Sequence, residues 1–172
     1  MRWHGSLISG RSVQGPVILV MLSGIALMIF MFLKKMTTTK AIDTGASIFE
    51  KLKNQGFNDI MSKFITSQSA FETADFNSKI FKENNNAFGM KYAGQMFAAG
   101  EKNGYANYLN VDDSVSDFVK WYNKHRQNIF SLPLIIFTLA DYVRFLKNNN
   151  YFEALESSYL AGVQSYYNLY YG

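Results

Sequence analysis

The protein has 172 residues and a formal net charge of +4, with 17 basic and 13 acidic side chains spread along the chain. This length suits one domain with an appendage, and the dispersed charge argues against binding to nucleic acid, which usually needs a concentrated basic face. The chain has no cysteine, which excludes disulfides and thiol catalysis, and its only histidines are His4 and His125. The sequence therefore predicts neither a metal site nor a cofactor.

An uncharged apolar run, residues 16–33, follows an N-terminal tail of residues 1–15. As a helix rising about 1.5 Å per residue, this run would be about 27 Å long, close to the hydrocarbon thickness of a bilayer. It is longer than the apolar region of a typical signal peptide, and no small-residue cleavage site precedes the polar residues after it. We expect a single transmembrane helix that contacts the lipid bilayer. Basic residues on both sides leave its orientation open.

A folded domain is expected after this run. Residues 34–45 are small and polar, as in a linker, so we place the boundary near Ala41 and the domain over residues 46–172. Its first element is predicted to be a short helix, residues 46–54, which Gly56 ends as a C-cap.

The next helix is predicted to begin at Asn58 or Asp59, both favourable N-caps. On this helix Gln68 and Glu72 lie four residues apart and therefore share one side, next to the apolar stripe. The apolar positions of the helix are Ile60, Met61, Phe64, Ile65 and Phe71.

The middle of the domain is rich in glycine, alanine and aromatic residues, and Asn103-Gly104 predicts a β-hairpin turn there. A helix capped by Asp112 or Asp113 follows. Two further helices are expected over residues 134–147, with Pro133 in the first turn, and over about residues 151–170. The fold class is therefore mainly α (α+β), with one small hairpin.

Glu72 is the candidate acid, although a glutamate at the edge of an apolar stripe is usually only a boundary residue. Phe71 and Phe76 could desolvate one side of its carboxyl group, which would raise the pKa toward the range of a general acid. Gly89 follows in the stretch NNNAFGMK, where backbone could approach a ligand closely.

Several stretches of the chain together resemble a known family. These are Phe71-Glu72-Thr73-Ala74-Asp75-Phe76, Asn86-Ala87-Phe88-Gly89-Met90-Lys91, residues 105–122 and residues 145–167. They are similar to the bacterial and phage β-N-acetylglucosaminidases, the flagellar and autolysin type of peptidoglycan hydrolase. The resemblance covers about 130 residues in register. It implies a lysozyme-like helical lobe with a β-hairpin at the cleft, and Glu72 as the general acid.

A second carboxylate is normally needed for glycoside hydrolysis, and in this family it comes from the hairpin. Glu101 is the acidic residue of the hairpin and is our first candidate, with Asp112 and Asp113 as runners-up. The sequence departs from the family where the tyrosine of an Ala-Gly-Tyr motif falls on Val163. Two outcomes are open: Tyr166 or Tyr167 supplies the hydroxyl, or the function is weakened.

Other residues are expected to bind the glycan. Sugar rings stack on aromatic side chains and hydrogen-bond to phenols, which favours tyrosines on or near the hairpin over Trp121, which we expect in the core. The predicted substrate-binding residues are Asn86, Phe88, Gly89, Lys91, Tyr92, Tyr105, Tyr108 and Tyr166.

The apolar run and the resemblance together predict a membrane-anchored peptidoglycan hydrolase that cleaves β-1,4 glycosidic bonds, with its domain facing the cell wall or periplasm, or in a virion membrane if the protein is phage-encoded. One alternative is a lytic transglycosylase that uses Glu72 alone. Another, of a different class, is a non-catalytic membrane-bound glycan-binding or structural virion protein.

Overall fold

The computed structural model describes residues 15–127 and 138–172, and the chain divides into two compact units, Met1–Thr39 and Lys40–Gly172. Its first helix, α1 (Gly15–Asn54), includes both the predicted apolar run and the predicted linker. The short helix expected over residues 46–54 is therefore the last part of a longer helix. It ends where predicted, and Gly56 follows with a φ of +90°.

The apolar run of α1 is exposed where its side chains are described. Leu27, Met28, Ile29, Phe30, Met31, Phe32 and Leu33 are each 53–67% exposed. Among the described residues, no helix is both long and apolar enough to cross a membrane. The side chains of residues 16–25, where the predicted span begins, lie outside this part of the chain.

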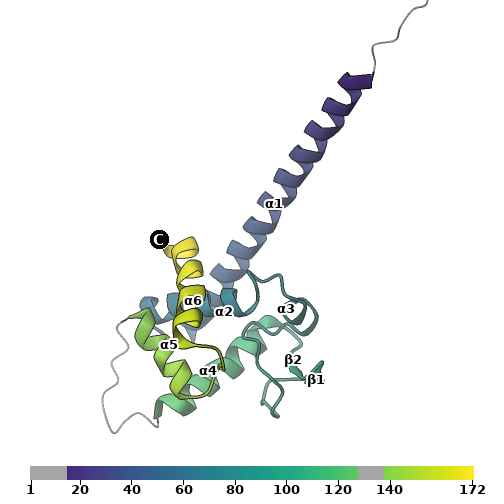
Figure 1. The fold of residues 1–172 in the computed structure, drawn as a ribbon. Coiled ribbons are helices and arrows are strands. Elements are labelled where there is room, and N and C mark those ends of the chain that lie inside the picture. Colours follow the sequence, from purple (N-terminus) through teal and green to yellow (C-terminus); the bar gives the residue numbers. More distant parts are fainter. Residues whose placement is uncertain (1–14, 128–137) are drawn as a thin grey trace, which may run out of the picture. The chain divides into compact units, whose positions relative to one another are not determined.

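The second unit is built mainly from short helices (Figure 1). They are α2 (Asp59–Glu72), α3 (Lys79–Asn84), α4 (Val111–Gln127), α5 (Leu139–Asn148) and α6 (Glu156–Tyr171). The predicted start of α2 is confirmed, because the Asn58 side chain accepts a hydrogen bond from the backbone N–H of Met61 at 2.9 Å.

Two helix starts differ from the prediction. Helix α6 begins at Glu156, because the expected first residues, 151–155, are irregular and follow a turn in which Asn150 has a φ of +55°. Helix α5 begins at Leu139, where Thr138 and Asp141 form a capping box. The predicted start of that helix, with Pro133, lies outside the described residues.

The predicted β-hairpin is confirmed. Strands β1 (Gly100–Lys102) and β2 (Tyr105–Asn107) pair antiparallel, with Gly100 opposite Asn107. The turn residues Asn103 and Gly104 have φ angles of +58° and +80°, as a type I′ turn requires. Tyr105 also bridges to Lys91, so the hairpin is tied to the loop that precedes it.

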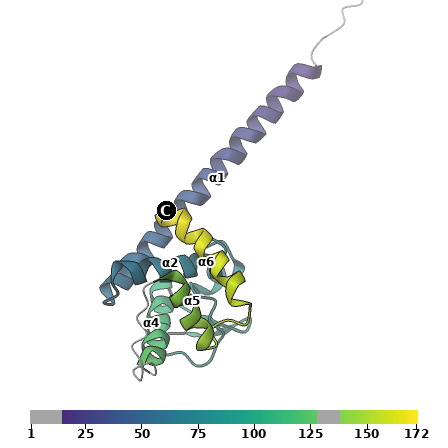
Figure 2. The same ribbon diagram turned by 60° about the vertical axis from the view of Figure 1, so that its left-hand side comes forward.

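The core lies where α2 meets the other helices. Helices α2 and α6 pack against each other, as do α5 and α6, and both views of the ribbon show this arrangement (Figures 1 and 2). Gly162 of α6 permits the close approach, because a Cβ atom there would lie 2.2 Å from the Phe71 ring. Ile60, which was assigned to the apolar face of α2, is 55% exposed, since it lies beside the buried stripe of Met61, Phe64 and Ile65.

The described part of the second unit is thus mainly helical, with one two-stranded antiparallel sheet. This arrangement is consistent with the lysozyme-like lobe that the resemblance implies.

Candidate active site

Glu72 is the last residue of α2, and the chain turns sharply after it. Ala74, Asp75 and Phe76 have φ angles of +49°, +59° and +59°, a left-handed conformation that costs free energy for residues with a Cβ atom. Thr73 stabilises the turn, because its Oγ1 accepts the backbone N–H of Phe76 at 3.0 Å. The chain therefore leaves the helix directly after the acid.

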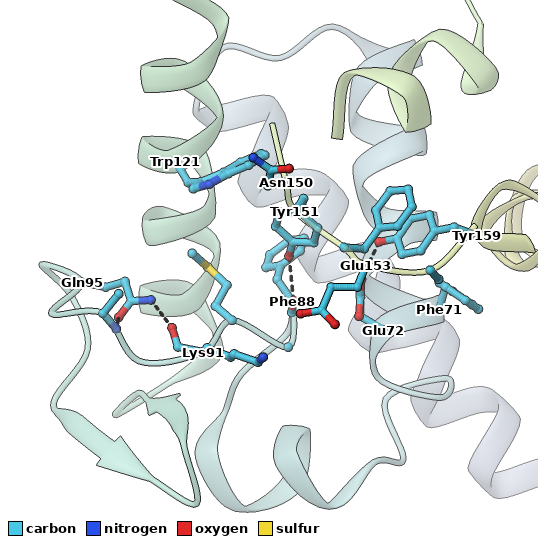
Figure 3. A pocket seen from close by; sticks show the side chains of 15 residues that line it. Phe71, Glu72, Phe88, Lys91, Gln95, Trp121, Asn150, Tyr151, Glu153 and Tyr159 are labelled. Atoms are coloured by element: carbon cyan, nitrogen blue, oxygen red, sulfur yellow. Dashed lines mark hydrogen bonds between the residues drawn. The ribbon is translucent and has the colours of Figure 1, made fainter. Parts of the chain in front are cut away.

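The carboxyl group of Glu72 is half-buried and hydrogen-bonded (Figure 3). The hydroxyl of Tyr159 in α6 donates to Oε1 of Glu72. Burial raises the pKa of Glu72 above its ordinary value, and the hydrogen bond from Tyr159 opposes part of this rise. Such a carboxyl holds its proton to a higher pH than an exposed glutamate does.

Tyr159 is itself fixed by two aromatic contacts. Its ring stacks on Phe152 at 3.7 Å between centroids and 2° between planes, and it meets Phe71 edge-on at 5.1 Å. The phenol that touches the acid is therefore held by α2 on one side and by the α5–α6 connection, residues 149–155, on the other.

The turn at Phe88-Gly89 forms the wall next to Glu72. Gly89 has a φ of +60°, and a Cβ atom there would lie 3.3 Å from Oε2 of Glu72. The buried Asn86 side chain shapes this turn, because it accepts the backbone N–H of Met90 at 3.1 Å and donates to the carbonyl of Ala106 at 3.0 Å. Glycine is thus needed where backbone runs against the acid.

Two further contacts, both made by Phe88, fix the same turn. The ring of Phe88 stacks on Phe118 at 4.1 Å, and the carbonyl of Phe88 accepts a hydrogen bond from the Tyr151 hydroxyl at 2.7 Å. The turn is therefore joined to α4 and to the α5–α6 connection.

A cleft of about 710 Å³ opens beside Glu72 (Figure 3). Among the described residues that line it, the ionisable carboxyl groups are those of Glu72 and Glu153, and the cationic group is that of Lys91. The lining consists of Phe71, Glu72, Phe88, Gly89, Met90, Lys91, Ala93, Gln95, Trp121, Asn150, Tyr151, Phe152, Glu153, Ala154 and Tyr159.

The predicted substrate-binding residues fall into two groups. Phe88, Gly89 and Lys91 line the cleft together with Glu72. The others lie outside the lining: Asn86 and Tyr108 are buried, Tyr92 is exposed, and Tyr105 and Tyr166 are half-buried. Trp121, which the sequence placed in the core, lines the cleft while also packing on Phe118 and Tyr151.

The candidates for the second carboxylate also lie elsewhere. Glu101 is exposed, and its Oε1 accepts the backbone N–H of Gly104 at 2.8 Å, so its side chain supports the hairpin turn. Asp112 pairs with Lys51 at 3.1 Å. The prediction that Asp112 or Asp113 caps α4 is wrong, because Asn110 accepts the backbone N–H of Asp113 at 2.9 Å and serves as the cap.

Among the cleft residues that sequence reasoning missed, Tyr159 and Glu153 bear most directly on the chemistry of Glu72. The tyrosine hydroxyl was expected from Tyr166 or Tyr167 because the family motif was placed at Val163. Val163 is buried, and Tyr159 lies four residues earlier, on the same face of α6. A search for tyrosines one turn away in both directions would have found it.

A half-buried carboxyl with a raised pKa at the wall of an open cleft is the arrangement of a glycosidase general acid. The fold and site thus fit the class of glycoside hydrolases. Residues 49–171 match the family model Glucosaminidase, described as mannosyl-glycoprotein endo-beta-N-acetylglucosaminidase. The chain belongs to this family, and it is a glycoside hydrolase that acts on peptidoglycan. Comparison with curated proteins and with solved structures gives no match.

Proposed function

We propose that the enzyme cleaves the β-1,4 bonds of peptidoglycan glycan strands after N-acetylglucosamine, with Glu72 as the general acid. The observation that carries this proposal is the Glu72 carboxyl, whose pKa is raised by burial and which lines the cleft. The protonated carboxyl donates to the glycosidic oxygen while the bond from that oxygen to C1 breaks.

The cleft supplies the contacts that a glycan strand needs. Its volume of about 710 Å³ lies in the range of ligand sites, and Trp121 offers an aromatic face to sugar C–H groups. Lys91 offers a positive charge for the carboxylates that peptidoglycan carries. Tyr159 holds the acid in place through its hydroxyl.

The test compares the full chain with its Glu72→Gln variant in detergent solution. The wild type should release soluble fragments from purified peptidoglycan, and the variant should be slower by about 10² to 10⁴, the usual worth of general acid catalysis. The control is Glu83→Gln, because Glu83 pairs with Lys102 at 3.4 Å outside the cleft lining and should leave turnover unchanged. Equal rates for wild type and Glu72→Gln would rule out this role.

A lytic transglycosylase is the second candidate, and the place of Glu101 favours it. A transglycosylase needs only one acid, because the 6-hydroxyl of the substrate replaces water, and Glu101 lies outside the cleft lining. Mass spectrometry separates the two reactions: anhydro-sugar ends identify a transglycosylase, and reducing ends identify a hydrolase.

We also propose that residues 16–33 anchor the enzyme in a membrane, with the catalytic domain toward the cell wall. The support is the uncharged run and the exposed apolar side chains from Leu27 to Leu33. The full chain should float with liposomes, and Phe30→Lys with Phe32→Lys should weaken flotation, whereas two lysines at Glu50 and Glu101 should not. A chain that stays at the bottom of the gradient would contradict the anchor.

A phage origin is proposed because one anchor and one small hydrolase domain make a minimal tool for wall penetration or lysis. Detection of the chain by mass spectrometry in purified virions would support it, and detection only in uninfected cells would contradict it.

A further inference from the structure

The cleft contains a second carboxylate that the resemblance does not indicate. Glu153 belongs to the α5–α6 connection, is exposed, and lines the cleft together with Glu72 (Figure 3). Among the described residues, no ion pair and no side-chain hydrogen bond involves its carboxylate. The group is therefore available to water or substrate.

The backbone that carries Glu153 is held firmly. The ammonium group of Lys147 donates to the carbonyls of Glu153 and Ala154, at 3.0 and 2.8 Å, and lies 5.2 Å from the centre of the Phe152 ring. Such contacts restrict the connection to few conformations, which is what a catalytic group on a loop requires.

The same connection is joined to the acid. Phe152, the residue before Glu153, stacks on Tyr159, and Tyr159 donates to Glu72. Glu153 is thus linked to Glu72 through its neighbour Phe152, the stacking of Phe152 on Tyr159 and the hydrogen bond from Tyr159 to Glu72. The hairpin acid Glu101 has no such connection, since its carboxylate accepts the backbone N–H of Gly104.

We propose that Glu153 is the second catalytic carboxylate of this enzyme and acts as a general base on the attacking water. This inference rests on the proposed role of Glu72. Glu153 takes one proton from water as the water oxygen forms a bond to C1 of the sugar. Glu72 gives its proton to the glycosidic oxygen as that oxygen leaves C1, so the products are a sugar hemiacetal and an alcohol.

The geometry of such a pair predicts the stereochemistry. A retaining pair lies about 5 Å apart, and charges that close shift each other's pKa strongly. An inverting pair lies farther apart, at about 6.5–9.5 Å, which leaves room for a water. Because Glu153 lines the cleft with Glu72 and is proposed to act on water and not on C1 itself, we expect inversion at C1.

The experiment uses the full chain with soluble peptidoglycan fragments and compares Glu153→Gln with Glu156→Gln. Glu156 is a neighbouring glutamate that pairs with Arg144 at 3.4 Å and lies outside the cleft lining. The Glu153 variant should lose about 10² to 10⁴ in kcat with KM little changed. The Glu156 variant should keep wild-type turnover. Circular dichroism confirms that both are folded.

Azide then separates catalysis from a merely structural role. It attacks C1 without giving up a proton, so it should restore bond cleavage to Glu153→Gln and yield a glycosyl azide of inverted configuration, while Glu72→Gln stays inactive. Wild-type turnover by Glu153→Gln, no azide product, or retention at C1 would each overturn the role of Glu153. Wild-type turnover by Glu153→Gln or retention at C1 would leave the role of Glu72 intact. That role is tested only by the Glu72→Gln variant.

Discussion

The two sides of the cleft region differ in how they are built. The acid side combines α2, α6 and the α5–α6 connection, and it joins Glu72, Tyr159 and Phe152 by direct contacts. The hairpin side is small, and its acid Glu101 is exposed. The hairpin reaches the cleft indirectly, through the bridge between Tyr105 and Lys91. The comparison teaches that packed elements position Glu72, while the hairpin supports a neighbouring loop.

Among substitutions that test the difference between the two sides, Gly89→Ala on the acid side is expected to have the largest effect on turnover. The new Cβ atom would lie 3.3 Å from Glu72 Oε2, and displacement of a reacting group by about 1 Å can cost about 10² in rate. The left-handed φ of +60° adds a stability loss of about 1–2 kcal/mol. Turnover and denaturant unfolding measure the two effects.

Gly94→Ala is the matched control for this variant. Gly94 has a similar φ of +71°, but a Cβ atom there would contact nothing within 4 Å. We expect a comparable stability loss with wild-type turnover. If both variants lose activity equally, backbone strain rather than the contact with Glu72 explains the effect.

Tyr159→Phe should lower turnover by about tenfold, the worth of a hydrogen bond to a charged or reacting group. The hydroxyl lowers the pKa of Glu72, so its removal raises that pKa further. Because the general acid must be protonated, the alkaline limb of the pH–rate profile should move to higher pH. Tyr170→Phe removes a hydroxyl that donates to Asp75 from the same helix and should leave the limb in place. An unmoved limb in Tyr159→Phe would contradict this coupling.

The free energy of unfolding should fall as pH rises through the titration of Glu72, whereas an ion-paired acid with a lowered pKa would make it rise. The folded-state pKa lies above the unfolded value of about 4.5, so the folded state binds more protons. Stability is therefore lost as pH rises above about 4.5, until Glu72 is ionised in the folded state too. Glu72→Gln should be more stable than wild type at neutral pH, and the difference should vanish below pH 4. Thermal unfolding across this pH range provides the measurement.

Ala74→Gly should stabilise the protein by up to about 1 kcal/mol, because glycine adopts the φ of +49° without the cost that a Cβ atom carries. Ala161→Gly, at an exposed position within α6, should have the opposite sign and destabilise by about 1 kcal/mol. Urea unfolding of both variants tests the prediction, and a destabilised Ala74→Gly would show that the turn is not strained.

The smallest effect is expected from Glu101→Gln on the hairpin side. The glutamine retains an oxygen that can accept the backbone N–H of Gly104, so turnover should stay within about twofold of wild type. A large loss of turnover, measured on peptidoglycan fragments, would restore the hairpin as the source of the second carboxylate.

The sequence predicted those features that local chemistry determines. The Asn58 cap and the Asn103-Gly104 turn follow from residue types and spacing. It did not predict Tyr159 or Glu153 at the cleft, because Tyr159 depends on how α6 packs on α2, and Glu153 depends on how Lys147 of α5 holds the α5–α6 connection. Helical periodicity gives the face of a residue but not the neighbour that this face meets.

The close approach of α6 to α2 depends on an atom that is absent. Helix α6 meets α2 at two neighbouring places. Gly162 lies against Phe71, and Tyr159, three residues before Gly162, contacts Glu72, the residue after Phe71. A methyl group at Gly162 would overlap the Phe71 ring and push the helices apart. The Tyr159 hydroxyl would then lie too far from Glu72 to donate its hydrogen bond. The absence of one methyl group at Gly162, outside the cleft lining, thus permits the hydrogen bond from Tyr159 to Glu72.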